Sequence, residues 1–235
     1  PELTEKIRLF ISGSAPLLEE TFHEFYQRTN HQILERYGMT ETNMNTSNPL
    51  KGDRKSGTVG LPLEDVQVKV VDENDVILPQ GEIGNIQIKG PNVFKGYWKM
   101  PEKTKEDFSE DGYFNTGDKG LIDEDGYLSI IGRSKDMIIS GGLNIYPKEV
   151  ESIIDKMDGV LESAIIGISD EDLGEKVVAI IVSEEGALLN EKEVIAEVKD
   201  QLAGFKAPKE VKLVEQLPRN AMGKVQKNIL RDTFN

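Results

Sequence analysis

The hydrophobic pattern changes twice along this 235-residue chain, and these changes constrain the fold more than any other feature. At the start, apolar runs at residues 7–12 and 32–37 end in polar loops, and a segment of helical spacing (17–28) separates them. Apolar and polar residues then alternate between residues 66 and 131, with turn signals between the runs. After Arg133, helix and strand patterns mix again. We therefore expect a parallel α/β portion, a small antiparallel barrel or sheet, and a compact α+β unit.

The last hundred residues carry the clearest signals for individual elements. A helix is expected over 147–157, with proline in its first turn, and another over 190–202, with Asn190 as its N-cap. Strands are expected at 161–168, 177–183 and 210–215, and a final helix at 226–234. These elements form one domain, so we place the domain boundary after residue 134, giving domains 1–134 and 135–235.

Composition excludes several classes of function. The chain has no cysteine, which excludes disulfides, thiolate catalysis and cysteine-based zinc sites and fits a cytoplasmic location. Its net charge of −14 argues against nucleic acid or an anionic membrane as the main partner. No apolar run reaches the roughly 20 residues of a membrane span. Neither common glycine-rich phosphate fingerprint occurs, and His23 and His31 have no metal-ligand spacing.

The first motif with chemical potential follows the second expected strand. It reads Tyr37-Gly38-Met39-Thr40-Glu41. An aromatic ring, a glycine, a hydroxyl and a carboxylate at a strand end could stack a base, approach a phosphate and bind Mg²⁺. A plain strand-to-loop turn would explain the same residues.

Each of three later motifs can likewise be explained by ligand binding or by local structure alone. Asp118 follows a glycine turn and could accept both hydroxyls of a ribose, although an Asx turn alone would be the better explanation. Gly141 and Gly142 would let the backbone approach a ligand closely, although a linker before a helix would look alike. Lys224 lies on a glycine-containing loop near the C-terminus, where a solvated surface lysine is the ordinary case.

In this order the motifs resemble those of the adenylate-forming superfamily: acyl-CoA synthetases, firefly luciferases and peptide-synthetase adenylation domains. The resemblance runs from Ile7 to Arg231. It implies an α/β and α+β architecture, with the C-terminal part of a large AMP-binding domain followed by a small mobile lid domain. It also implies an ATP-dependent acid–CoA ligase that forms an acyl-adenylate and then an acyl-CoA, with ATP, Mg²⁺ and coenzyme A as cofactors and cosubstrates.

The same resemblance implies a role for each motif. ATP or AMP would be bound by the first turn, the tyrosine motif and two later residues, namely Gly13, Ser14, Ala15, Pro16, Tyr37, Gly38, Thr40, Asp118 and Arg133. Thr40 would act at the α-phosphate and Glu41 would bind Mg²⁺. Lys224 would contact the substrate carboxylate and the α-phosphate during catalysis. Lys135 would be the hinge, and Gly141 with Gly142 would line the path of the CoA pantetheine.

The choice of acid rests on fewer residues. The segment 35–47 looks most like the malonyl-CoA synthetase branch, and many relatives have a small residue where Arg36 stands. A guanidinium beside the acyl pocket could bind the second carboxylate of malonate or methylmalonate, helped by a hydrogen bond from Ser14. Alternatively, Arg36 points away and pairs with Glu35 or Glu41.

Other functions stay open at this point. They are a ligase for another short or medium carboxylic acid, an enzyme that loads a carrier protein, and a non-catalytic nucleotide-binding module. The phosphate-binding loop of the family's N-terminal half is missing, so we expect a portion of a longer protein that does not adenylate alone. The resemblance also implies that a protein acetyltransferase could act on Lys224 and remove its charge.

Overall fold

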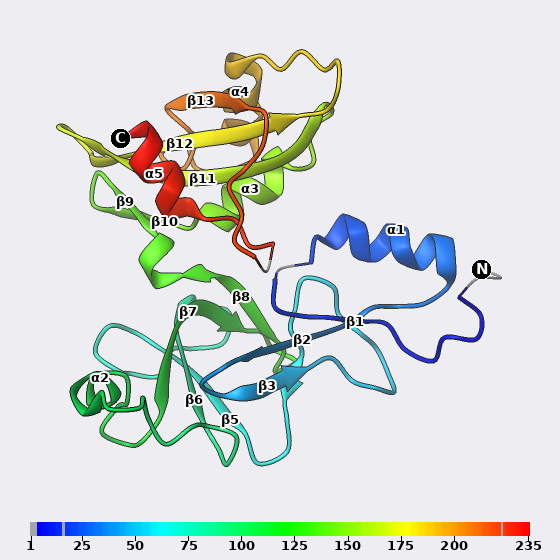
Figure 1. Ribbon diagram of the computed structural model, residues 1–235, viewed down its shortest axis with the longest axis vertical. Helices are drawn as coiled ribbons and strands as arrows, with labels where there is room; N and C mark the ends of the chain where they lie inside the picture. Colours follow the sequence, from blue (N-terminus) through cyan, green and yellow to red (C-terminus); the bar gives the residue numbers. More distant parts are fainter. Residues whose placement is uncertain (1–3, 16, 222) are drawn as a thin grey trace. The chain divides into compact units, whose positions relative to one another are not determined.

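The structure, a computed structural model, describes residues 4–15, 17–221 and 223–235. They form two compact units that divide between Ile131 and Gly132 (Figure 1). The first unit contains two sheets and two helices, and the second contains one sheet and three α-helices. Among the described residues, no helix has the length and apolar character needed to cross a membrane.

The first sheet of unit 1 is mixed rather than fully parallel. Its strands lie in chain order: β1 (Ile11–Ser12), β2 (Leu34–Met39), β3 (Asn43–Ser47) and β4 (Leu61–Pro62). Helix α1 (Glu19–Thr29) connects β1 to β2, which are parallel, as such a crossover requires. The other two pairs are antiparallel. The parallel expectation therefore holds for one pair only, and β3 stands where the sequence predicted a loop.

The second sheet of unit 1 is open, so the predicted barrel is wrong. Its order is β5 (Gln67–Val71), β6 (Gly84–Lys89), β7 (Phe114–Ile122) and β8 (Leu128–Arg133), and α2 (Pro101–Glu106) lies between β6 and β7 in the chain. Within the described part of the chain, β5 and β8 do not pair. The reason is that β8 has another neighbour: Leu128 forms a bridge with Gly60, next to β4. Closure would need β8 to pair with β5 along this edge.

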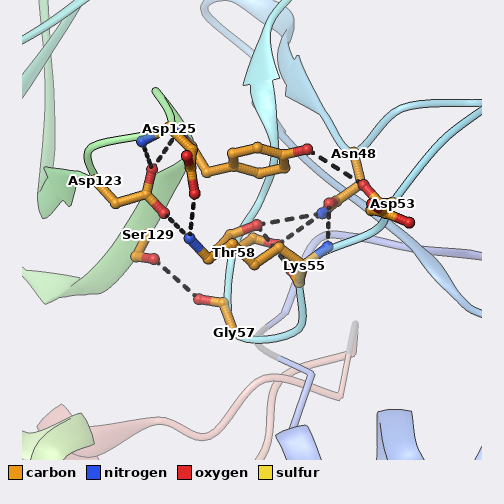
Figure 2. A network of polar contacts seen from close by, with 9 residues as sticks. Asn48, Asp53, Lys55, Gly57, Thr58, Asp123, Asp125 and Ser129 are labelled. Atoms are coloured by element: carbon orange, nitrogen blue, oxygen red, sulfur yellow. Dashed lines mark hydrogen bonds and ion pairs between the residues drawn. The ribbon is translucent and has the colours of Figure 1, made fainter.

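A polar network ties the loop after β3 to the turn before β8 (Figure 2). The Lys55 ammonium donates to the carboxylates of Asp123 and Asp125 at 2.5 and 3.2 Å. The Ser129 hydroxyl donates to the Gly57 carbonyl at 3.1 Å. Lys55 and Asp125 are exposed, so water screens these ion pairs and they contribute little to stability. These contacts hold the loop that follows β3 of the first sheet against the turn and strand at β8 of the second sheet.

Unit 2 has one sheet with a separate core on each face. Its strands are β9 (Ile138–Ser140), β10 (Leu143–Ile145), β11 (Val160–Asp170), β12 (Gly174–Ser183) and β13 (Glu210–Val214), in the order β10-β9-β12-β11, with β13 parallel to β12. Its α-helices are α3 (Pro147–Ile154), α4 (Glu191–Gln201) and α5 (Lys227–Phe234). Ile165 and Ile181 pack in a cluster with α3 and α4, whereas Ile166 and Ile180 pack in a second cluster with Leu230 of α5. This period of two confirms the predicted α+β unit.

Candidate active site

Two of the predicted nucleotide-binding residues touch in unit 1. The Tyr37 hydroxyl donates to Asp118 Oδ2 at 2.5 Å. Tyr37 comes from β2 and Asp118 from β7, so the contact joins the two sheets. Both side chains are buried, with exposed fractions of 7% and 5%, and the Tyr37 ring packs in a cluster that contains Ile86 and Ile88. The core of the second sheet thus fixes the position of this pair.

The hairpin of β2 and β3 presents Thr40 and Glu41 between its strands. A β-bulge lies between Tyr37 and Gly38, a feature that often occurs next to active sites. Gly38 cannot be replaced without rearrangement, because an added Cβ would lie 2.0 Å from the Asn43 carbonyl oxygen. Thr40 is exposed and Glu41 is half-buried. The strand pairing therefore places a hydroxyl and a carboxylate next to each other at an accessible turn.

Glu41 can serve as part of a magnesium site. Its Oε1 accepts a hydrogen bond from the Tyr97 hydroxyl at 3.2 Å, and its carbonyl accepts one from Phe94 N–H at 2.7 Å. No group of three or more acidic, histidine or cysteine side chains that could hold a metal is found in the ranges described above. Mg²⁺ is commonly bound by one or two carboxylates together with substrate phosphates, and a single carboxylate fits that pattern.

The turn after β1 lies against Arg36. An added Cβ on Gly13 would be 3.3 Å from the Arg36 carbonyl oxygen and 3.6 Å from its Cγ. Arg36 is exposed, and no ion pair joins it to Glu35 or Glu41 in the described structure. Ser14 adopts the left-handed conformation with φ of 69°, and Ser14 and Ala15 are exposed. Pro16, predicted to bind the nucleotide, lies outside the described residues.

Glu35 is an unusual neighbour of Arg36, because its carboxyl is buried. Its exposed fraction is 7%, and Oε1 has no hydrogen-bond partner in the part of the chain described here. Burial, with a smaller contribution from Glu19, raises the pKa of this carboxyl from 4.5 to about 7. The folded chain therefore holds a proton here at pH values where the unfolded chain has lost it.

We expect the stability of this 235-residue chain to fall as pH rises between about 5 and 7, by on the order of 3 kcal/mol. Stability falls as pH rises because the native state binds more protons than the unfolded state over that range. Glu35→Gln should flatten this slope and raise stability at pH 8, as measured by urea unfolding followed by circular dichroism. Glu20→Gln, on the exposed side of α1, should keep the slope. If stability depends on pH as steeply in Glu35→Gln as in the original chain, the buried proton is not on Glu35.

In unit 2, Lys224 lies on a hairpin that its neighbours hold firmly. Lys224 N–H donates to Asn220 Oδ1, and Asn220 N–H donates to the Lys224 carbonyl, both at 3.0 Å. The Arg219 guanidinium donates to the Gly223 carbonyl at 2.7 Å and forms an ion pair with Glu162 of β11. The Lys224 side chain is exposed, and the described structure contains no ion pair to it. A fixed backbone thus carries an accessible ammonium.

The predicted CoA-binding glycines form a tight turn rather than an open linker. Gly141 and Gly142 have φ of 58° and 79° and are the two central residues of the β9–β10 hairpin, a geometry that favours glycine at both positions. Gly141 N–H donates to the Leu173 carbonyl at 2.8 Å, which anchors the turn at the β11–β12 connection. Both glycines are exposed.

The predicted hinge lies at the start of unit 2. Lys135 is exposed in a short 3₁₀ helix, Ser134–Asp136, and Arg133 ends β8. Arg231 of α5 donates to the next residue, Asp136, at 2.9 Å. This ion pair ties the end of the 3₁₀ helix to the last helix.

Sequence reasoning missed the residues that support these side chains. Arg219 and Asn220 precede Lys224 in the same glycine-containing loop, and the ability of their side chains to bond to the loop backbone was the available signal. Phe94 and Tyr97 follow β6 in a segment without regular periodicity, so nothing in the sequence linked them to Glu41.

Comparison with known proteins gives the family. A model described as AMP-binding enzyme matches residues 1–98, and one described as AMP-binding enzyme C-terminal domain matches residues 149–224. The malonate–CoA ligase of Arabidopsis thaliana is 45% identical over 97% of this chain and 39% of its own length. The oxalate–CoA ligase of Saccharomyces cerevisiae is 38% identical over 97% of this chain and 42% of its own length.

A solved structure is more similar still. MatB from Rhodopseudomonas palustris, with ATP bound, is 59% identical and superimposes with a TM-score of 0.94 over 97% of this chain and 45% of its own. The chain belongs to the adenylate-forming AMP-binding enzyme family. It spans about two fifths of the length of the curated relatives it matches.

Proposed function

We propose that this chain is the C-terminal portion of an ATP-dependent acid–CoA ligase whose acid is malonate or methylmalonate. The observation that carries the proposal is the 45% identity to a malonate–CoA ligase over 97% of this chain. The geometry is consistent with it: Arg36, Thr40 and Glu41 belong to the hairpin of β2 and β3, which also carries Tyr37, the partner of Asp118.

In the first half-reaction, a carboxylate oxygen of the acid attacks the α-phosphorus of ATP, and pyrophosphate leaves. Negative charge builds up at the α-phosphate, where the Lys224 ammonium and the Thr40 hydroxyl would stabilise it. Mg²⁺ held by Glu41 would supply further neutralisation of the phosphates. Asp118, with Arg133, would hold the ribose hydroxyls, and the Tyr37 ring would stack on the adenine.

In the second half-reaction, the CoA sulfur attacks the acyl carbonyl as the thiol loses its proton, and AMP leaves. The Gly141–Gly142 turn has no side chains, so its backbone could lie directly against the pantetheine. Lys135 would be the pivot for a change of conformation between the two steps. The Arg36 guanidinium would bind the carboxylate of the acid that does not react.

The test is AMP formation by the full-length parent with CoA and a panel of malonate, methylmalonate, oxalate, acetate and a medium-chain fatty acid. We expect malonate or methylmalonate to lead. If another acid leads, the ligase class stands and the malonate assignment fails. If AMP forms only with a carrier protein in place of CoA, or ATP binds without turnover, the CoA-ligase proposal itself fails. The 235-residue chain alone is expected to form no AMP.

We also propose that acetylation of Lys224 by a protein acetyltransferase regulates the enzyme. The exposed side chain is accessible for modification, and acetylation would remove the charge that the first half-reaction needs. Enzymatically acetylated parent should lose adenylation and regain it on deacetylation. Normal adenylation by fully acetylated protein would exclude this regulation.

A further inference from the structure

The segment from Asn92 to Tyr97 holds the hairpin that carries Glu41. The Asn92 side-chain amide donates to the carbonyl of Thr42 at 2.6 Å, to the carbonyl of Met44 at 3.1 Å and to Asn45 Oδ1 at 3.1 Å. The amide has two hydrogens, so one of them is shared between two of these three acceptors, which all lie on the far side of the turn. The hairpin is braced by a segment about fifty residues away in the chain.

The same segment reaches Glu41 twice. Phe94 N–H donates to the Glu41 carbonyl at 2.7 Å, which fixes the backbone. The Tyr97 hydroxyl donates to Glu41 Oε1 at 3.2 Å, which contacts the carboxylate itself. Among the described residues, this is the only hydrogen bond to that carboxylate, because no other partner of Glu41 Oε1 or Oε2 is found. The orientation of the carboxylate therefore depends on one phenol.

Tyr97 is itself held from both sides. Its N–H donates to the Thr104 hydroxyl of α2 at 2.9 Å. Its ring packs edge-on against Phe94, with ring centroids 4.8 Å apart, and Phe94 in turn packs against Phe114 of β7. At Gly96, an added Cβ would lie 2.6 Å from Thr104 Cγ2, so this approach of the loop to α2 needs glycine. A phenol so placed can direct another side chain without moving itself.

We propose that Tyr97 is a positioning residue for metal binding: its hydroxyl bond to Oε1 holds the Glu41 carboxylate in one orientation, in which its remaining lone pairs can bind a divalent cation. The inference rests on the proposed function, in which Glu41 is the magnesium ligand. A tyrosine that only filled space would need no hydroxyl here.

The test measures metal binding without turnover. Mn²⁺ replaces Mg²⁺ in the full-length parent with ATP, and its affinity is read from the relaxation of water protons. Tyr97→Phe keeps the ring and its packing, and we expect it to weaken Mn²⁺ binding about five-fold, the size expected for one hydrogen bond. The Mg²⁺ concentration that gives half-maximal AMP formation should rise by the same factor. The KM for the acid and the thermal midpoint should not change.

Two controls separate positioning from general damage. Tyr113→Phe also removes a phenol that is hydrogen-bonded, to Gln67 at 2.7 Å, and should leave metal affinity unchanged. In a Glu41→Gln background, Tyr97→Phe should have no further effect on metal affinity, since the two residues act as one unit. Unchanged Mn²⁺ affinity in Tyr97→Phe overturns the inference. A parent that forms no AMP with any acid overturns the proposed function instead, while the Mn²⁺ comparison still decides the role of Tyr97.

Discussion

Replacing Lys224 with alanine in the full-length parent is expected to lower the rate of acyl-adenylate formation by about 10²–10³-fold. The loss is large because the ammonium would act where negative charge develops, on a group bound away from bulk water. The fold of the loop should survive, since Asn220 bonds to backbone atoms of residue 224 and Arg219 bonds to the Gly223 carbonyl. CoA thioester formation from chemically prepared acyl-adenylate should be nearly unaffected.

The measurement is pyrophosphate release in the first step and AMP release from added adenylate in the second. Lys199→Ala removes an exposed lysine from α4 and is the matched control, which should leave both rates unchanged. If Lys224→Ala forms adenylate at the normal rate, or if both half-reactions fall together, the assignment of Lys224 to the first step is wrong.

Arg36→Ala is expected to raise the KM for malonate by about 10–150-fold, because a hydrogen bond to a charged group contributes about 1.5–3 kcal/mol. Acetate lacks the second carboxylate and should be used about as well as before, so the ratio of kcat/KM values for the two acids should fall. Arg36→Lys keeps the charge but not the two parallel donors, and we expect an intermediate loss. Folding should be unaffected because the side chain is exposed.

The control for this prediction lies in the same unit. Arg28 is an exposed arginine at the end of α1, paired with Glu24 at 2.5 Å, and Arg28→Ala should leave the ranking of the acids unchanged. If Arg36→Ala also leaves the ranking unchanged, the second carboxylate is bound elsewhere, and the identity of residue 36 carries no information about the substrate.

The elements of unit 2 could be predicted well because their local signals agree. Asn190 was expected to cap a helix, and its side chain accepts the Lys192 N–H at 2.9 Å. Pro147 was expected in a first turn and begins α3. The long apolar strands β11 and β12 differ from the predicted ranges only at their ends, because burial on both faces leaves a continuous apolar run.

Prediction failed where tertiary contacts decide the structure. Residues 43–47 include two asparagines, which have little preference for strands, yet the segment forms β3 because β2 and β4 supply partners on both sides. The barrel was predicted from alternation alone, and alternation does not say whether the edge strands meet. The contact of Tyr97 with Glu41 joins segments 56 residues apart, and no local pattern encodes it.

The hairpin that carries Lys224 and the turn formed by Gly141 and Gly142 are anchored at opposite ends of one strand. The lysine hairpin is tied through Arg219 to Glu162, near the start of β11, and the glycine turn is tied to Leu173, just beyond its end. From Glu162 to Asp170 an extended chain covers about 26 Å. A strand hydrogen-bonded along its length does not shorten, so the separation of the two anchors is constant. If the two loops act as proposed, a single reacting atom would meet only one of them at a time, so the two half-reactions would use the two loops separately.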